Sequence, residues 1–401
     1  MPKQIQWIKK RHAIIKKLVY PIFSRSAFKK YGFKVEPYTE GKDRQFLIVM
    51  NHQTPYDQFF AGLLFPQPLY YVASEDLFSN GFVSRLLEWA VKPIPIKKST
   101  QDLSAIRNMM SVAKQGGSIC IFPEGNRTYS GTTVCIKPAI ARIIEKIKIP
   151  VAIVRLEGGF GVEPRWSNIQ RSGKVTAKIA RIVEPEEYEK MSHQEFYDLL
   201  NNTLFVDDTT NGQLFKSHAK AEFIERFLYW CPTCGVTKFL SSKNQCKCTK
   251  CNKIFTYNED LTLSGDFEFK YLKDWNKAQT DFITSLDLKP LFNKLILQDK
   301  VNLYEVKVYK SKKLFLKNAT LELYGSKIIF KTKKQILELT FDQITSASCL
   351  GHNKLNIYIG TKLYQIKGNE RFNSLVYMHF YYHYYNTITT NNGGSNEFLG
   401  L

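Results

Sequence analysis

The chain has 401 residues, enough for two or three domains that each bury a core. Its formal net charge of +21 and its pI near 9.4 favour a negatively charged partner, either a membrane surface or nucleic acid. The sequence contains no run of eighteen apolar residues and no signal-peptide pattern, so we expect neither a transmembrane span nor secretion.

Residues 1–35 combine basic and apolar side chains, and every charged residue among them is basic. The apolar residues fall near helical spacing: Ile5, Ile8, Ile15, Leu18, Val19 and Ile22, with Trp7, Tyr20 and Phe23 among them. A basic amphipathic helix with aromatic residues is typical of an anchor at the surface of an anionic membrane. The pattern also suits a helix that packs on a domain and exposes a solvated basic face, and one helix can do both.

Short apolar runs alternate with helical segments between residues 46 and 183. We expect strands near 46–50, 69–73, 118–122, 151–156 and 175–183, and helices near 56–65, 79–90, 101–115 and 137–147. A capping box of Ser192 and Glu195 opens a further helix that runs to Leu200. This alternation predicts an α/β layered domain over residues 36–215.

The first polar motif, Asn51-His52-Gln53-Thr54-Pro55-Tyr56-Asp57, follows the apolar run 45–50. A histidine at the end of a strand, with a carboxylate five residues later, can be held in one tautomer and accept a proton. His52 and Asp57 are therefore a candidate general base and its partner. The alternative is a turn in which Asn51 and Asp57 only satisfy backbone groups.

The second motif, Pro123-Glu124-Gly125-Asn126-Arg127-Thr128, follows the apolar strand 118–122. Pro123 ends the strand and Gly125 allows a sharp turn, so Glu124 and Arg127 are presented together. The planar guanidinium of Arg127 suits a phosphate monoester. Alternatively, Arg127 forms a buried ion pair with Glu124.

The two motifs, in this order, resemble the signature of the glycerophospholipid acyltransferases of the lysophosphatidate (1-acylglycerol-3-phosphate) acyltransferase type. That signature is Asn-His-x-(Ser/Thr)-x-x-Asp followed by Phe-Pro-Glu-Gly-(Thr)-Arg-(Ser/Thr). The resemblance covers roughly residues 20–205. Asn126 stands where the family usually has threonine, and Ala139 stands where it has glycine in a Lys-x-Gly segment.

The resemblance implies transfer of a fatty acyl group from acyl-CoA or acyl carrier protein to the hydroxyl of a lysophospholipid. His52 would be the base and Asp57 would orient it. The residues implied in binding the acceptor phosphate are Glu124, Gly125, Arg127 and Lys137, together with Lys97 or Lys98 from an aligned basic segment. The preferred acceptor is lysophosphatidate, which gives phosphatidate, while glycerol-3-phosphate and other lysolipids stay open. Apolar residues at 59–89, including Phe82, Leu86 and Trp89, line an acyl-chain groove or form core.

Two Cys-x-x-Cys knuckles predict a structural zinc ribbon over residues 216–260. The expected ligands are Cys231, Cys234, Cys248 and Cys251, and Cys246 is a spare thiol or an alternate ligand. A metal ion with four thiolate ligands has no open position for catalysis. We therefore favour a structural ion that stabilises a segment too short to have its own core. The alternative is a module that contacts nucleic acid or protein. Grouped cysteines of this kind indicate a reducing compartment.

We expect connecting helices at 261–300. Alternation of apolar and polar residues then predicts a series of strands, and a single C-terminal helix, Asn369–Tyr385, follows them. This order resembles a pleckstrin-homology (PH) or GRAM-like domain, here at 301–386, that binds lipid headgroups or a protein. We expect a disordered tail at 387–401.

Together these features predict a cytoplasmic acyltransferase, peripheral at the inner face of the cell membrane, without a nucleic-acid partner. The alternative is a non-catalytic membrane or nucleic-acid adaptor that uses the ribbon and the β domain.

Overall fold

The computed structural model describes residues 5–40, 44–79, 81–96, 102–134, 136–307 and 311–391. The chain divides into two compact units. Unit 1 comprises Met1–Pro164 and Arg171–Phe215, and unit 2 comprises Arg165–Gln170 and Lys216–Leu401.

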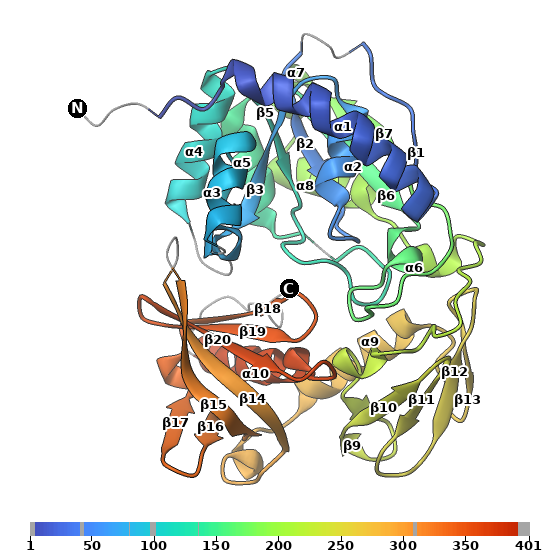
Figure 1. Ribbon diagram of the computed structural model, residues 1–401, viewed down its shortest axis with the longest axis vertical. Helices are drawn as coiled ribbons and strands as arrows, with labels where there is room; N and C mark the ends of the chain where they lie inside the picture. Colours follow the sequence, from blue (N-terminus) through green and yellow to red (C-terminus); the bar gives the residue numbers. More distant parts are fainter. Residues whose placement is uncertain are drawn as a thin grey trace. The chain divides into compact units, whose positions relative to one another are not determined.

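A seven-stranded sheet forms the centre of unit 1, in the order β1-β7-β6-β2-β5-β3-β4 (Figure 1). All neighbouring strands are parallel except β6 and β7. The strands are β1 (Lys34–Val35), β2 (Leu47–Met50), β3 (Leu69–Ser74), β4 (Ile94–Ile96), β5 (Ser118–Ile121), β6 (Val151–Glu157) and β7 (Thr176–Val183). The predicted α/β architecture is confirmed, and of the strands in this sheet the sequence analysis missed the short β1 and β4.

Helices connect and cover these strands. They are α1 (Lys10–Tyr31), α2 (Asp57–Leu64), α3 (Phe82–Ala90), α4 (Leu103–Lys114), α5 (Pro138–Ile147), α6 (Gly159–Val162), α7 (Pro185–Tyr188) and α8 (His193–Leu204). β2 is central and fully buried, and its Leu47 and Val49 pack in one cluster with α4, α5 and α8. The capping box of Ser192 and Glu195 opens α8 as predicted. This packing fixes the end of β2, where the first motif begins.

Helix α1 is held on unit 1 through one face. Lys16 belongs to this face of α1 and donates hydrogen bonds to the carbonyl oxygens of Phe65 and Gln67. His12 contacts the Tyr70 hydroxyl at 2.9 Å, and the Tyr31 hydroxyl donates to Glu163 at 2.6 Å. Because these contacts come from one side of the helix, the opposite side stays exposed. The packing hypothesis for this helix is therefore correct for one of its faces.

The apolar residues of α3 correct an expectation. Phe82, Leu86 and Trp89 are exposed, so they belong neither to the core nor to a closed groove. Phe60 and Leu64 of the preceding helix α2, in contrast, are buried as core residues are.

Unit 2 begins with a cysteine-containing segment. A hairpin of β8 (Trp230–Cys231) and β9 (Gly235–Val236) precedes an antiparallel sheet of β10 (Phe239–Ser242), β11 (Gln245–Cys248), β12 (Ile254–Tyr257) and β13 (Leu263–Gly265). The sheet thus continues past residue 260, because β13 pairs with β12. Helix α9 (Leu272–Ser285) follows, as expected for a connecting helix.

The C-terminal part of unit 2 is a seven-stranded antiparallel sheet in the order β17-β16-β15-β14-β20-β19-β18, followed by α10 (Ser374–Asn391) (Figure 1). Its strands are β14 (Leu297–Lys307), β15 (Ser311–Leu323), β16 (Lys327–Lys331), β17 (Ile336–Thr340), β18 (Ser346–Leu350), β19 (Lys354–Ile359) and β20 (Lys362–Gly368). Residues 387–391 are helical and correct the expected disordered tail, whose remainder lies outside the described residues. Short 3-10 helices occur at Glu75–Ser79, Asp208–Thr210, Ile224–Arg226, Lys289–Leu291 and Phe341–Gln343.

Charged side chains connect the cysteine-containing segment to the C-terminal sheet within unit 2. Arg371, between β20 and α10, pairs with both Glu222 and Glu225. Lys238 of the first segment pairs with Asp299 of β14 at 2.6 Å. The two segments are therefore joined by ion pairs as well as by the chain.

We predict that the contact between α1 and α2 depends on Gly62. A Cβ atom at this helical position would lie 2.1 Å from the Tyr20 hydroxyl, so Gly62→Ala should destabilise unit 1 by about 1–3 kcal/mol. In a Tyr20→Ala background the clash is gone, and Gly62→Ala should be neutral or stabilising by up to about 1 kcal/mol, because alanine favours a helix. Urea denaturation of the four proteins of this double-mutant cycle measures the difference. Equal effects of Gly62→Ala in both backgrounds would contradict this account.

Candidate active site and cysteine cluster

His52 and Asp57 lie together at the end of β2. The His52 Nδ1 atom is 2.7 Å from Asp57 Oδ2, and the ring is partly exposed whereas the carboxylate is fully buried. A carboxylate only accepts hydrogen bonds, so Nδ1 carries the proton in this pair and Nε2 keeps its lone pair. The neutral ring can thus accept a proton at Nε2.

The loop between the two residues positions Asp57. Its carboxylate accepts hydrogen bonds from the backbone N–H groups of Gln53 (2.6 Å) and Thr54 (3.0 Å) and from the Thr54 hydroxyl (2.5 Å). Asp57 is also the first residue of α2, where a negative charge interacts favourably with the helix dipole. These contacts fix the carboxylate in one orientation toward the imidazole. Asp57 therefore satisfies backbone groups of the turn and also contacts the His52 ring.

Two other residues of the motif hold it against β6 and the segment that follows β6. The buried Asn51 side chain donates to the Leu156 carbonyl at 2.9 Å and accepts from the Leu156 N–H at 2.7 Å. Gln53 Oε1 accepts from the Gly159 N–H at 2.8 Å. These partners are more than a hundred residues away in the sequence, so the motif alone did not assign these roles.

The second motif encloses the backbone of His52 on both sides. Glu124 Oε1 accepts from the His52 N–H at 2.6 Å, and the Thr128 N–H donates to the His52 carbonyl at 3.0 Å. The other Glu124 oxygen accepts from the Val134 N–H at 2.8 Å. Glu124 is buried, and both of its oxygens are engaged by backbone donors, so its contacts here position His52.

Phe122, which the sequence analysis did not single out, stacks on the His52 ring with 4.5 Å between the ring centroids. Together with the Asp57 hydrogen bond, this contact restricts the rotation of the imidazole. Gly125 is exposed with a φ of 67°, a left-handed conformation that favours glycine. Arg127 is half-buried and directly precedes Thr128, so its backbone lies beside that of His52.

Of the remaining predicted phosphate contacts, Lys137 is the one within the described residues. Lys137 is exposed and immediately precedes α5. Lys97 and Lys98 lie outside the described residues.

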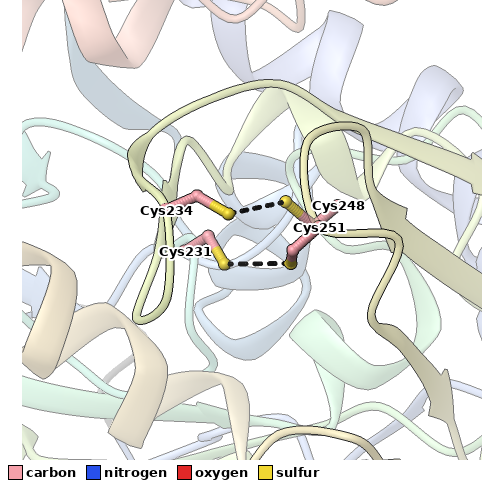
Figure 2. A group of neighbouring side chains, drawn as sticks. All are labelled: Cys231, Cys234, Cys248 and Cys251. Atoms are coloured by element: carbon pink, nitrogen blue, oxygen red, sulfur yellow. Dashed lines mark hydrogen bonds between the residues drawn. The ribbon is translucent and has the colours of Figure 1, made fainter.

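The four predicted ligand cysteines come together in unit 2 (Figure 2). Their sulfur atoms all lie within 4.8 Å of one another, with 3.8 Å between Cys231 and Cys251 and 4.0 Å between Cys234 and Cys248. Four sulfurs each about 2.3 Å from a tetrahedral ion lie about 3.8 Å apart, so the arrangement fits a single metal ion.

The same backbone conformation follows both knuckles, but their turn hydrogen bonds differ, since in the second knuckle the Asn252 N–H donates to the Cys248 carbonyl at 3.0 Å. The Cys234 N–H donates to the Cys231 carbonyl at 3.1 Å, and each knuckle is followed by a residue with positive φ, Gly235 at 72° and Asn252 at 63°. Glycine and asparagine are the residues that accept this conformation most readily. Cys246 is buried and is not part of the group, as expected for a spare thiol.

Comparison with known proteins places the His52 site in a class. The family model described as Acyltransferase matches residues 33–156, the part of the chain that carries His52. The match includes both motifs and confirms the resemblance that they indicated.

A curated relative is the 1-acyl-sn-glycerol-3-phosphate acyltransferase of Bacillus subtilis (strain 168), with 26% identity over 117 residues. The matched segment is 29% of this chain and 57% of that relative. Among solved structures, the 1-acyl-sn-glycerophosphate acyltransferase of Thermotoga maritima aligns with a TM-score of 0.40 and 22% identity over 48% of this chain and 78% of that chain.

Burial of two carboxyls in unit 1 predicts a pH-dependent stability. Burial raises the pKa of Glu124 from 4.5 to about 8, and burial raises the pKa of Asp208, which accepts from the N–H groups of Gly158 and Phe160, from 3.8 to about 7. A raised folded-state pKa gives stability that is complete below the unfolded-state pKa and is lost as the pH rises through the folded value.

We therefore expect the free energy of unfolding to fall as the pH rises from 4.5 to 8, and Glu124→Gln to reduce this fall. Urea denaturation at the two pH values measures it, and Glu145→Gln, at a partly exposed carboxyl, is the control. A Glu124→Gln protein with an unchanged pH dependence would contradict the assignment.

Proposed function

We propose that unit 1 transfers a fatty acyl group from a thioester to the free hydroxyl of a lysophospholipid, with His52 as the general base. One observation carries this proposal: the His52 Nδ1 atom lies 2.7 Å from a fully buried carboxylate, inside a segment that the acyltransferase family model matches. No residue needs to form a covalent intermediate, because a thioester is already an activated acyl donor.

In the proposed reaction the acceptor hydroxyl oxygen attacks the thioester carbonyl carbon while its proton moves to His52 Nε2. The tetrahedral intermediate then collapses, the C–S bond breaks, and the thiolate leaves as a thiol after His52 returns the proton. The Asp57 carboxylate stabilises the imidazolium that forms between the two steps. The buried Asp57 and its three loop donors support this role, since they hold the carboxylate in place through both steps.

Phosphate recognition is assigned to Arg127, with Gly125 allowing close backbone approach and with Lys137 and Lys97 as further cations. Glu124 contributes to this site by fixing the backbone of His52, because its two oxygens already accept backbone hydrogen bonds. Lysophosphatidate is the preferred acceptor, in line with the named activity of the B. subtilis relative, and the product is phosphatidate. The donor is acyl-CoA or acyl carrier protein.

The cysteine cluster is proposed to hold a structural zinc ion through Cys231, Cys234, Cys248 and Cys251. The sulfur spacing and the all-thiol donor set support this assignment. Zinc would fix the two knuckles relative to each other, and four protein ligands leave no open position for a substrate. Under this proposal residues 216–260 form a zinc ribbon.

The C-terminal sheet and α10 are proposed to be a PH-like domain, because seven antiparallel strands in this order followed by one helix are the elements of that class. Its lysines would bind anionic headgroups.

We also propose that the protein is peripheral at the cytoplasmic face of the cell membrane, with α1 at the interface. Within the described ranges, no helix combines the length and the apolar character that crossing a bilayer requires.

A non-catalytic adaptor is the competing proposal. It does not explain why a buried carboxylate and a second motif both hold one partly exposed histidine in place.

His52→Ala should reduce acyl transfer by roughly 100-fold or more, since a positioned general base contributes about two to four orders of magnitude. Turnover of labelled acyl-CoA with a panel of lysolipids measures this loss. His193→Ala is the matched control, because His193 also pairs with a carboxylate, Glu145, at 3.0 Å elsewhere in unit 1. A His52→Ala protein that turns over at the wild-type rate would refute the proposed base.

The purified wild-type protein should contain one zinc ion per chain, and Cys234→Ser should lose it because one of four thiolate ligands is missing. Inductively coupled plasma mass spectrometry measures the metal. Cys246→Ser is the control, since this buried thiol lies outside the group. The zinc assignment is wrong if the wild type carries no metal or if Cys246→Ser loses it.

A further inference from the structure

Helix α3 presents an apolar face to solvent that the packing of unit 1 does not explain. Phe82, Leu86 and Trp89 recur at helical spacing on one side of the helix, with exposed fractions of 76%, 48% and 54%. Ser84 is the buried residue of this helix. Large apolar side chains in a continuous exposed stripe indicate an interaction surface.

Helix α1 has a comparable face on the side opposite its anchoring contacts. Ile14, Leu18 and Ile22 follow one another at four-residue intervals and are 57%, 66% and 70% exposed. Arg25 and Lys29 continue the same side of the helix toward its C-terminus and are also exposed. The outward side of α1 is therefore apolar in one half and basic in the other.

The two faces adjoin each other. The Arg11 Nε atom donates to the Trp89 carbonyl at 2.8 Å, and the Arg11 guanidinium lies 5.3 Å from the centre of the Trp89 ring. Arg11 is one turn before Ile14, so the α3 stripe meets the start of the α1 stripe. We call the surface formed by Ile14, Leu18, Ile22, Phe82, Leu86 and Trp89 the α1–α3 face.

The charges around this face identify its partner. Every charged residue in positions 1–35 is basic, and on α3 Arg85 is exposed whereas the acidic Glu88 is half-buried. An apolar face bordered by arginine and lysine, with a tryptophan beside an arginine, suits the boundary between lipid headgroups and acyl chains. A protein partner would need acidic and apolar residues arranged to match the basic and apolar parts of this face. An anionic bilayer supplies negative headgroups and apolar acyl chains over its whole area.

We propose that α3 is a second membrane-contacting helix and that the α1–α3 face lies on an anionic bilayer. This proposal extends the proposed function, since a face on the bilayer would deliver the lysophospholipid acceptor to unit 1 from the membrane instead of from solution.

The test compares Phe82→Ser/Leu86→Ser with the wild type. Cosedimentation with vesicles of phosphatidylcholine and phosphatidylglycerol in equal parts should show a loss of affinity of roughly tenfold or more, because two large apolar side chains no longer enter the interface. The matched control is Phe205→Ser/Leu214→Ser, which removes the same residue types at 50% and 57% exposure elsewhere in unit 1 and should bind as the wild type does.

A second readout separates this proposal from the catalytic one. The α3 variant should lose turnover of lysophosphatidate embedded in vesicles and keep turnover of a short-chain, water-soluble lysophosphatidate. If the wild type turns over neither form, the catalytic proposal fails. The vesicle measurement still shows whether the α1–α3 face binds an anionic bilayer. Vesicle binding of the α3 variant at the wild-type level overturns the proposal, and so does a wild type that forms dimers through this face and does not bind vesicles.

Discussion

The ends of β2 and β5 meet at one edge of the sheet, and the hydrogen bonds between the loops that follow them are the constraint on which the site depends. Parallel neighbours in a sheet bring their carboxyl ends to the same edge, so motifs separated by some seventy residues become adjacent. The backbone of His52 is then bonded through its N–H to Glu124 and through its carbonyl to Thr128. With its backbone fixed on both sides and its ring held by Asp57 and Phe122, the imidazole has little freedom to leave its position.

The sequence predicted the local part of this arrangement well. His52 and Asp57 are five residues apart, at the two ends of the short segment between β2 and α2, so their contact is local in the sequence. The role of Glu124 was not predictable in the same way, because a carboxylate beside an arginine suggests an ion pair or a ligand, while its two backbone partners come from positions 52 and 134. Asp208 was missed for the same reason, since its donors are Gly158 and Phe160 at the start of α6.

Burial was the property that periodicity predicted least reliably. The spacing of apolar residues indicated helices at both α2 and α3, and both exist, but it could not distinguish a face that packs on the sheet from one that meets solvent. Phe60 of α2 is buried and Phe82 of α3 is largely exposed, although both are phenylalanines in amphipathic segments. The distinction depends on where each helix lies relative to the sheet, which is a tertiary property.

The basic residues of α1 have two different roles. Lys16 is turned inward, where burial lowers its pKa to about 8 and carbonyl oxygens accept its hydrogen bonds, so it serves to hold α1 on unit 1. Arg25 and Lys29 remain exposed on the opposite side of the same helix. A basic residue that is already bonded to carbonyls inside the protein cannot also bind phosphate. Direct contacts with an anionic partner therefore come from the outward residues, and the net charge of the chain overstates the number of cations available for such contacts.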